Sequence, residues 1–239
     1  MKTKVWTISI RIFHWLLAIG FTAAYILGDF DDYRNLHYAF GLFVGVLVLF
    51  RIIYGLIGPK YANFKDFPIG IKNQIEFFKH FLKKDEPYIG HNPAASVVML
   101  SLFLVGLLCS FSGFMRYSAE NNSFININLS EDFVEEAHEI LANLFLILVG
   151  IHLVGIIADL LFHAKTKTLQ SIFTGYKSVE GENSKQNAFH AIFSVIWFIV
   201  PFLAFIYGNN LNSENKTEIN QIEQHEKPNK SDENDEDDD

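Results

Sequence analysis

The sequence contains a single cysteine, Cys109, among its 239 residues. One thiol cannot form a disulfide within the chain, and it cannot supply the cysteines of a C-x-x-C-H haem attachment site or of an iron–sulfur cluster. Any haem that this chain binds must therefore be held without covalent links. The sequence also has no flavin-binding or nucleotide-binding motif, so it offers no substrate-oxidising machinery of its own.

Basic residues are also scarce, with 19 Lys and Arg against 27 Asp and Glu. Residues 209–239 hold 11 of the acids and only 3 of the lysines, so this tail accounts for the whole net charge of −8. The remaining chain is balanced and has no basic motif, which argues against nucleic-acid binding. The tail combines low hydrophobicity with a run of acids, a composition that predicts disorder.

Hydrophobic residues, by contrast, make up 50% of the chain and include 24 phenylalanines. A stretch of about 18 or more apolar residues predicts a membrane-spanning helix, because about 20 residues cross a hydrocarbon core of about 30 Å. The sequence therefore predicts an all-α membrane protein with a bundle of four transmembrane helices, a fifth transmembrane helix and the disordered acidic tail. The predicted spans cover about residues 8–28, 37–57, 94–115, 138–162 and 188–208.

Lysine and arginine residues are distributed unevenly between the loops. The N-terminal segment, the loop 58–93 and the loop 163–187 are rich in lysine, whereas the loops 29–36 and 116–137 carry one arginine each among several acids. Because cytoplasmic loops carry the excess of Lys and Arg, we expect a cytoplasmic N-terminus and a tail on the outer side. The stretch 69–84 is amphipathic and suits a helix on the membrane surface, with a solvated linker as the alternative.

The stretch "HEILANLFLILVGIH", residues 138–152, places a histidine at each end of an apolar run. Fourteen residues of α-helix turn through about 1400°, so His138 and His152 lie within about 40° of one face and roughly 21 Å apart along the axis. Because the helices alternate in direction, His14 reaches the depth of His152, and His37 reaches the depth of His138. We therefore expect each pair to clamp one haem iron from two sides.

Two other interpretations of these histidines stay open. A lone histidine in an apolar helix is more often a hydrogen-bonded core residue, although four at matched depths are harder to explain in that way. Metal-ion transport would need carboxylates or thiols at mid-membrane, where only Asp159 and Cys109 lie near. A haem-free membrane transporter or scaffold is therefore one functional alternative.

Four arginines lie at the depths of the expected haems, where they could pair with the haem propionates. Arg11 and Arg34 each precede a candidate ligand by three residues. Arg51 lies fourteen residues after His37, and Arg116 ends the third span. Each could equally be an interfacial anchor whose long side chain reaches out of the membrane.

These features together resemble the di-haem cytochrome b family, which includes bacterial cytochrome b-561 and the membrane subunits of nickel–iron hydrogenases. The matching motifs are "RIFHW" in the first span, "LHYAFGLFVGVLVLFRIIYG" in the second, "GHNP" before the third, and "HE" with a second histidine in the fourth. The resemblance covers about residues 5–177 and implies a di-haem four-helix membrane domain over residues 1–177. The additional span 188–208 and the tail 209–239 lie outside it. The iron ligands that it implies are His14, His37, His138 and His152.

The resemblance further implies two non-covalent haem b groups, and electron exchange between the quinone pool and a redox partner in the bacterial cytoplasmic (inner) membrane. His91 and Asn92 of "GHNP" are candidates to hydrogen-bond a quinone carbonyl, although Asn92 could simply cap the following helix. The expected outer partner is an oxidoreductase subunit or a c-type cytochrome. The chain would then be an electron-transfer subunit rather than a complete enzyme, with a free-standing quinol-oxidising cytochrome b as the alternative.

Overall fold

The computed structural model describes residues 2–81, 88–120 and 130–226, the side chains at positions 120 and 211–226 excepted. Among the described residues, five helices are long and apolar enough to cross a membrane. This confirms the predicted all-α membrane fold with five spans. The five are α1 (Ile8–Leu27), α2 (Arg34–Ile57), α4 (Pro93–Glu120), α5 (Glu131–Phe162) and α7 (Ala188–Glu226).

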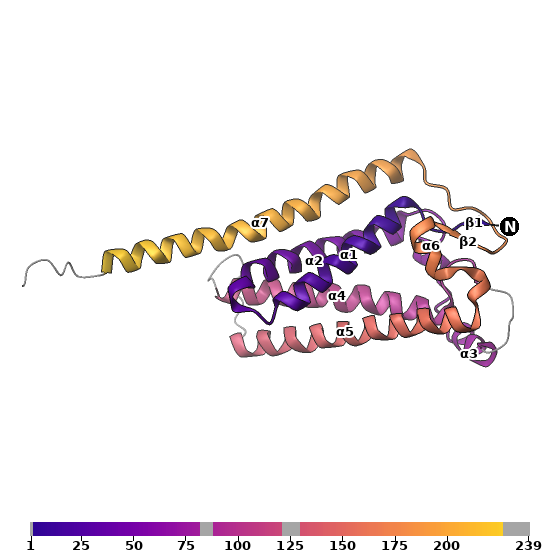
Figure 1. Cartoon of the computed structure of the whole chain (residues 1–239), viewed down its shortest axis with the longest axis horizontal. Helices are drawn as coiled ribbons and strands as arrows, with labels where there is room; N and C mark the ends of the chain where they lie inside the picture. The colour runs from indigo at the N-terminus through magenta and orange to yellow at the C-terminus, as the bar shows by residue number, and fades with distance from the viewer. Residues whose placement is uncertain (1, 82–87, 121–129, 227–239) are drawn as a thin grey trace, which may run out of the picture.

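The helices α1, α2, α4 and α5 form a bundle with α2 in a central position (Figure 1). Helix α2 packs against α1, α4 and α7, and α4 packs against α5. Small residues let α2 and α4 approach closely, because a Cβ atom added at Gly45 would lie only 2.7 Å from the Cβ atom of Ser110. Within the described helices, α1 and α5 are not closely packed against each other. The bundle is therefore closed along α2 and α4 rather than between α1 and α5.

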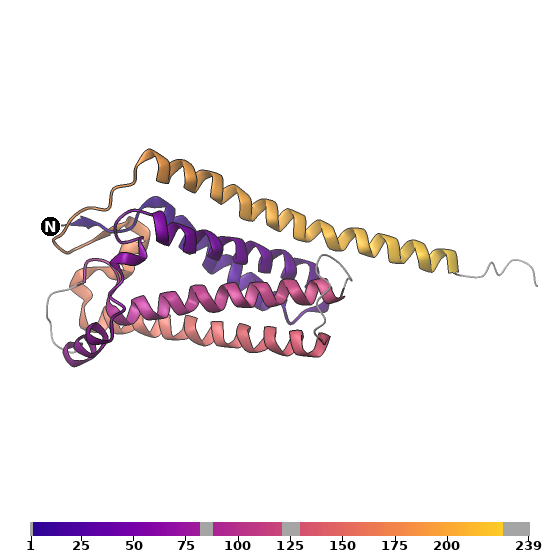
Figure 2. The same cartoon turned by 180° about the vertical axis from the view of Figure 1, so that it is seen from behind.

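Helix α7 lies along the outside of α2, as both views of the molecule show (Figures 1 and 2). Stacked rings hold the two helices together. The ring centroids of Phe50 and Trp197 are 4.7 Å apart, and those of Tyr54 and Phe193 are 6.4 Å apart with nearly parallel planes. The fifth span is therefore a packed part of the membrane domain.

Helix α7 has 39 residues and would be about 58 Å long, well beyond the roughly 30 Å of a hydrocarbon core. It continues to Glu226 and does not stop near position 208, where the predicted span ends and the predicted disorder begins. The sequence after this position is polar, with four Glu and two Gln but also five Asn up to Glu226, so the end of the apolar run marks the end of the span and not the end of the helix. Residues 227–239 of the predicted tail lie outside the described residues.

A small polar cap closes one end of the bundle. Strand β1 (Thr3–Lys4) pairs antiparallel with β2 (Tyr176–Lys177), which follows η3 (Ala164–Thr166) and α6 (Thr168–Thr174). The Thr3 hydroxyl donates a hydrogen bond to the Val179 carbonyl at 2.6 Å, and the Ser184 amide donates to the Lys4 carbonyl at 2.8 Å. These bonds attach the segment between β2 and α7 to the N-terminal strand β1. The same end carries η2 (Phe64–Asp66) and α3 (Ile71–His80), and the opposite end carries η1 (Asp31–Tyr33).

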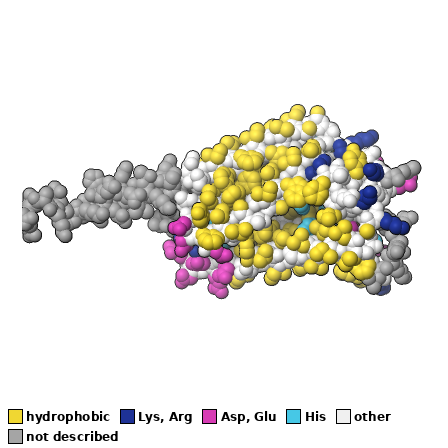
Figure 3. Space-filling model, in the orientation of Figure 1, with side chains coloured by type: hydrophobic (Ala, Val, Ile, Leu, Met, Phe, Trp, Pro, Cys, Tyr) yellow, Lys and Arg dark blue, Asp and Glu magenta, His cyan; other side chains and the backbone are white. Residues whose placement is uncertain are grey.

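The two ends of the bundle differ in charge, and Figure 3 shows Lys and Arg gathered at one end and Asp and Glu at the other, with an apolar band between them. We call the end with β1, β2, α3 and α6 the basic end. The opposite end, which includes η1 and the start of α5, is the acidic end. Helix α5 begins there seven residues before His138, because Ser130 caps it by accepting a hydrogen bond from the Phe133 amide. The predicted span started only at His138, since the first two turns are acidic and lack an apolar signal.

Candidate functional site

His37 of α2 and His138 of α5 meet toward the acidic end of the bundle. Their ring centroids are 6.0 Å apart, and their planes are inclined by 86°. Both side chains are half-buried. The structure thus brings together two histidines from helices that are not consecutive in the chain, as the sequence predicts.

Hydrogen bonds to neighbouring helices hold both rings through Nδ1. The Nδ1 atom of His37 lies 2.8 Å from the Ala24 carbonyl of α1, and that of His138 lies 3.1 Å from the Cys109 carbonyl of α4 and 3.0 Å from the Ser112 hydroxyl. Because a carbonyl oxygen only accepts, Nδ1 carries the proton in the neutral ring and the lone pair lies on Nε2. Histidines that bind metals are usually oriented in this way.

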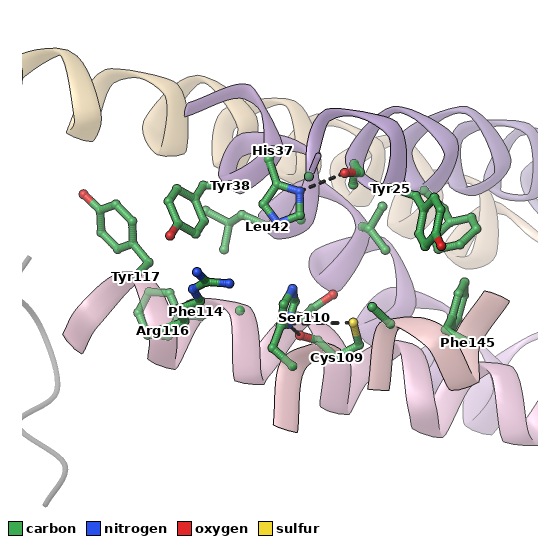
Figure 4. A pocket seen from close by; sticks show the side chains of 18 of the residues that line it. Tyr25, His37, Tyr38, Leu42, Cys109, Ser110, Phe114, Arg116, Tyr117 and Phe145 are labelled. Atoms are coloured by element: carbon green, nitrogen blue, oxygen red, sulfur yellow. Dashed lines mark hydrogen bonds between the residues drawn. The ribbon is translucent and has the colours of Figure 1, made fainter. Parts of the chain in front are cut away.

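The spacing of the pair and the surrounding cavity fit a haem. One iron between two imidazoles separates the ring centroids by about 6 Å, since each metal–nitrogen bond is about 2 Å and each nitrogen lies about 1 Å from its centroid. The pair lines a cavity of about 370 Å³, and ligand pockets in proteins measure about 300–1,000 Å³. A Cβ atom added at Gly41, in the wall of the cavity, would meet no atom within 4 Å. Figure 4 shows His37, Tyr38 and Arg116 around this cavity.

The second pair lies deeper, toward the basic end. His14 of α1 and His152 of α5 are half-buried and lie within electrostatic reach of each other. The Nδ1 atom of His14 is buried and has no hydrogen-bond partner. The backbones of α1 and α5 are not closely packed, although Phe21 of α1 and Phe145 of α5 have ring centroids 4.6 Å apart. This arrangement fits a second group held between them.

Two of the four candidate arginines, Arg51 and Arg116, lie inside the bundle or beside the outer cavity. Arg51 is only 2% exposed, its guanidinium lies 5.2 Å from the ring centroids of both Phe64 and Phe103, and its Nη1 atom is buried without a partner. A buried cation without a carboxylate is unfavourable unless an anion accompanies it. Arg116 lines the outer cavity, where it forms an ion pair of 2.8 Å with Glu135.

The other two arginines have different surroundings. Arg11 donates to the carbonyls of Ile172 and Phe173 in the last turn of α6, so it stabilises the end of that helix. Arg34 is exposed at the start of α2, and it is not among the residues that line the outer cavity. These positions favour structural roles over contact with a propionate.

His91 and Asn92 of the "GHNP" motif differ in their surroundings. The ring centroid of His91 lies 4.7 Å from that of Trp6 and 4.6 Å from that of Phe67, and its Nδ1 atom is buried without a partner. Burial, followed by the positive charges of Arg51 and Lys177, holds the pKa of His91 well below its usual value. His91 is therefore neutral at physiological pH.

Asn92 is engaged at the start of α4. Its side-chain oxygen accepts a hydrogen bond of 2.7 Å from the Ala95 amide, and its carbonyl accepts one of 2.9 Å from the Ser96 amide. This is the geometry of a helix cap. The contacts of Asn92 are therefore those of a helix cap, which the sequence analysis gives as the alternative to quinone binding.

Two contacts near the histidines carry no sequence signal. Ser112 contacts His138 only because α4 and α5 pack side by side. Lys177 of β2 is 5% exposed, and its ammonium donates to the Gly90 carbonyl at 2.8 Å, next to His91. Burial lowers the pKa of Lys177 to about 8, although the negative charge of Asp159 raises it. In the sequence, Lys177 is one of several loop lysines, and only the folded chain, in which its strand pairs with Thr3, buries it.

Comparisons with known proteins identify the family of the chain. Residues 5–175 match the family described as prokaryotic cytochrome b561. A probable Ni/Fe-hydrogenase 1 B-type cytochrome subunit of Escherichia coli (strain K12) is 26% identical over 140 residues, which cover 48% of this chain and 60% of that protein. A probable Ni/Fe-hydrogenase B-type cytochrome subunit of Rhodobacter capsulatus is 27% identical over 131 residues, which cover 43% of this chain and 50% of that protein.

The chain thus spans between half and three fifths of the length of these curated relatives. No solved structure shows significant similarity to it. The family match, however, runs through all four bundle helices and includes all four histidines of the two pairs. The chain belongs to the prokaryotic cytochrome b561 family.

Proposed function

We propose that this membrane cytochrome b transfers electrons across the membrane through two haem b groups. His37 and His138 would hold one haem, and His14 and His152 the other. The spacing of 6.0 Å between the His37 and His138 rings is the observation that carries this proposal. Within the described residues, no three His, Cys, Asp or Glu side chains gather into a group that could hold a metal ion.

The protein's contribution is to hold each haem from both faces and to balance its charge. When bound, haem supplies a one-electron couple of ferric and ferrous iron, and two histidine ligands favour electron transfer over oxygen binding. The Nδ1 hydrogen bonds to Ala24 and Cys109 fix the orientation of the outer ligands. Arg51 would offset the propionates of the deeper haem, and Arg116 those of the outer haem.

We place the basic end of the bundle at the cytoplasmic face of a bacterial inner membrane, following the excess of lysine there. A quinone would exchange electrons and protons with the deeper haem at this end. His91 supports such a site, because its buried, neutral ring has one nitrogen without a partner. Since Asn92 caps α4, its side-chain oxygen is already engaged.

A redox partner would meet the outer haem at the acidic end. The curated relatives are named as B-type cytochrome subunits of Ni/Fe-hydrogenases, so we propose a catalytic oxidoreductase subunit as the partner, with a c-type cytochrome as a second possibility. The chain would then work as the membrane subunit of such a complex. Co-purification from the native membrane distinguishes this role from that of a free-standing quinol-oxidising cytochrome.

The test uses the full chain purified in detergent. A reduced-minus-oxidised spectrum and the haem-to-protein ratio are measured for the wild type, for His138→Ala and for the control His80→Ala, which changes a histidine of α3. We expect two haems per chain in the wild type and the control, and one in His138→Ala. A colourless wild-type protein, or full haem content in His138→Ala, would overturn the proposal.

A further inference from the structure

Helix α3 is fastened to the membrane domain by one of its faces. The Gln74 side-chain amide donates to the Pro93 carbonyl at 3.0 Å, at the point where α4 begins. Phe77 is buried, and the ring centroid of Phe81, which follows α3, lies 5.4 Å from that of Phe162, at the end of α5. These contacts hold α3 at the level where two membrane spans end.

A second face of α3 is apolar and points away from the protein. Ile71 is 73% exposed, Ile75 is 49% exposed and Phe78 is 68% exposed. Positions i, i+4 and i+7 of an α-helix lie within about 60° of one another, so these side chains form one stripe. Exposed apolar side chains are unfavourable in water, and α3 lies at the level where two candidate spans end, so a bilayer around those spans would reach this stripe at its interface.

A third face, next to the stripe, is basic. Lys72 and Lys79 are exposed and lie about 40–60° further round the helix than Ile75. The only acid of α3 is Glu76, beyond the lysines. A helix with adjoining packed, apolar and basic faces can meet protein, acyl chains and headgroups at once.

We propose that α3 lies in the membrane interface of the basic end, with its apolar stripe among the acyl chains and Lys72 and Lys79 at anionic phospholipid headgroups. A lipid surface explains the stripe better than a second protein, because the spans already bring the bilayer to this level. The excess of lysine at this end of the bundle complements an anionic leaflet. An interfacial helix of this kind is bound by its apolar area together with its attraction to anionic lipid.

The first test measures contact with acyl chains. Phe78→Trp reports on the stripe, and the matched control Asn73→Trp reports on an exposed position of the same helix about 140° away. Both variants are reconstituted in vesicles whose phospholipids are brominated near the glycerol end of the acyl chains, and the wild-type emission of Trp6, Trp15 and Trp197 is subtracted. We expect the added tryptophan in Phe78→Trp to be quenched at least about twofold more strongly than in Asn73→Trp.

Equal quenching of the two variants would overturn the proposal. Weak quenching at Phe78→Trp together with chemical cross-links between copies would assign the stripe to a second copy of the chain instead. Tryptophan quenching does not depend on haem. The interfacial position of α3 can therefore be refuted while the proposed electron transfer holds, and the electron transfer can be refuted while the position of α3 holds.

The second test concerns the headgroups. The emission of Phe78→Trp is compared in vesicles of phosphatidylcholine alone and with about 30 mol% phosphatidylglycerol. We expect a larger blue shift with the anionic lipid, and we expect Lys72→Gln combined with Lys79→Gln to abolish this difference. Identical shifts in the two lipids, or a difference that survives the double substitution, would overturn the anionic part of the proposal.

Discussion

His37 and His138 lie with their ring centroids 6.0 Å apart, and each ring is held by the carbonyl of a different neighbouring helix. Ala24 of α1 accepts from His37, and Cys109 of α4 accepts from His138. The rings themselves come from α2 and α5, so all four bundle helices define this one pair. The geometry of the outer site is therefore a property of the assembled bundle and of no single motif.

The pairing of the histidines predicts a pattern among double variants. His37→Ala and His138→Ala should each lose the same haem, and the double variant should lose no more than either single one, because one missing ligand already opens the site. His37→Ala combined with His14→Ala should lose both haems. The haem-to-protein ratio checks this. Additive losses for His37 and His138 would show that the two rings serve different groups.

Ser112 should tune the outer haem without being needed to bind it. Its hydroxyl lies 3.0 Å from His138 Nδ1, and removing it in Ser112→Ala leaves Nδ1 with the Cys109 carbonyl at 3.1 Å and the Cys109 sulfur at 3.9 Å. A less basic ligand stabilises ferric iron less, so we expect the haem to stay and its midpoint potential to rise by roughly 20–60 mV. A redox titration measures this, with Ser110→Ala on the same helix as the control. A potential that moves equally in both variants would contradict the assigned role.

Gly113 provides the space in which the His138 ring lies. A Cβ atom at this position would be 2.9 Å from His138 Cε1, closer than real Cβ contacts. Because the ring is held by two hydrogen bonds, Gly113→Ala should displace it and reduce the occupancy of the outer haem, while the deeper haem remains. Gly70→Ala is the control, since this position lies outside the bundle and its Cβ would come no closer than 3.5 Å to another side chain. Haem spectra of both variants measure the occupancy of each haem. Full occupancy of the outer haem in Gly113→Ala would contradict the prediction.

Arg51 should affect the haem-free and the haem-loaded protein in opposite directions. Without an anion, a buried and partly unpaired guanidinium is unfavourable, so Arg51→Met should raise the Tm of the haem-free protein. With haem bound, the same change should weaken retention of the deeper haem by about tenfold or more, corresponding to about 1.5–3 kcal/mol for a lost charged hydrogen bond. Thermal unfolding and haem-release assays measure the two effects. Arg51→Lys should restore part of the haem retention, and a loss of stability in both forms would refute the anion role.

Lys177 should make stability depend on pH in the alkaline range. Its pKa is lowered to about 8 in the folded protein, against about 10.4 for an ordinary lysine. Between these values the unfolded chain binds more protons, so stability should rise with pH from about 8 to 10.4, by up to roughly 3 kcal/mol. Below pH 8 both states are protonated, so the cost of burying the charged Lys177 is present in full and does not change with pH. Lys177→Met should lack this rise, whereas Lys185→Met at an exposed position should keep it. Tm values measured from pH 7 to 10.5 give the answer.

The sequence by itself determined the five spans, because an unbroken run of about 20 apolar residues has few stable alternatives in a chain of this composition. It also determined the matching depths of the four histidines, since helical rise and the alternation of spans fix depth without any knowledge of packing. The family motifs lie on or directly before the first four of these spans and include the four histidines. The extent of α7 was less predictable, because hydrophobicity marks where a membrane span ends and not where a helix ends.

Only the tertiary structure decided which residues lie around the histidines. Arg11 and Arg51 look alike in the sequence, yet Arg11 donates to the carbonyls of α6 whereas Arg51 is buried between two aromatic rings. Ser112 and Lys177 acquire their roles from contacts with residues far away in the chain. Periodicity along one helix gives the depth and the face of a side chain, but its neighbours depend on how each helix is rotated and packed, and that is set by the side chains of all the helices together.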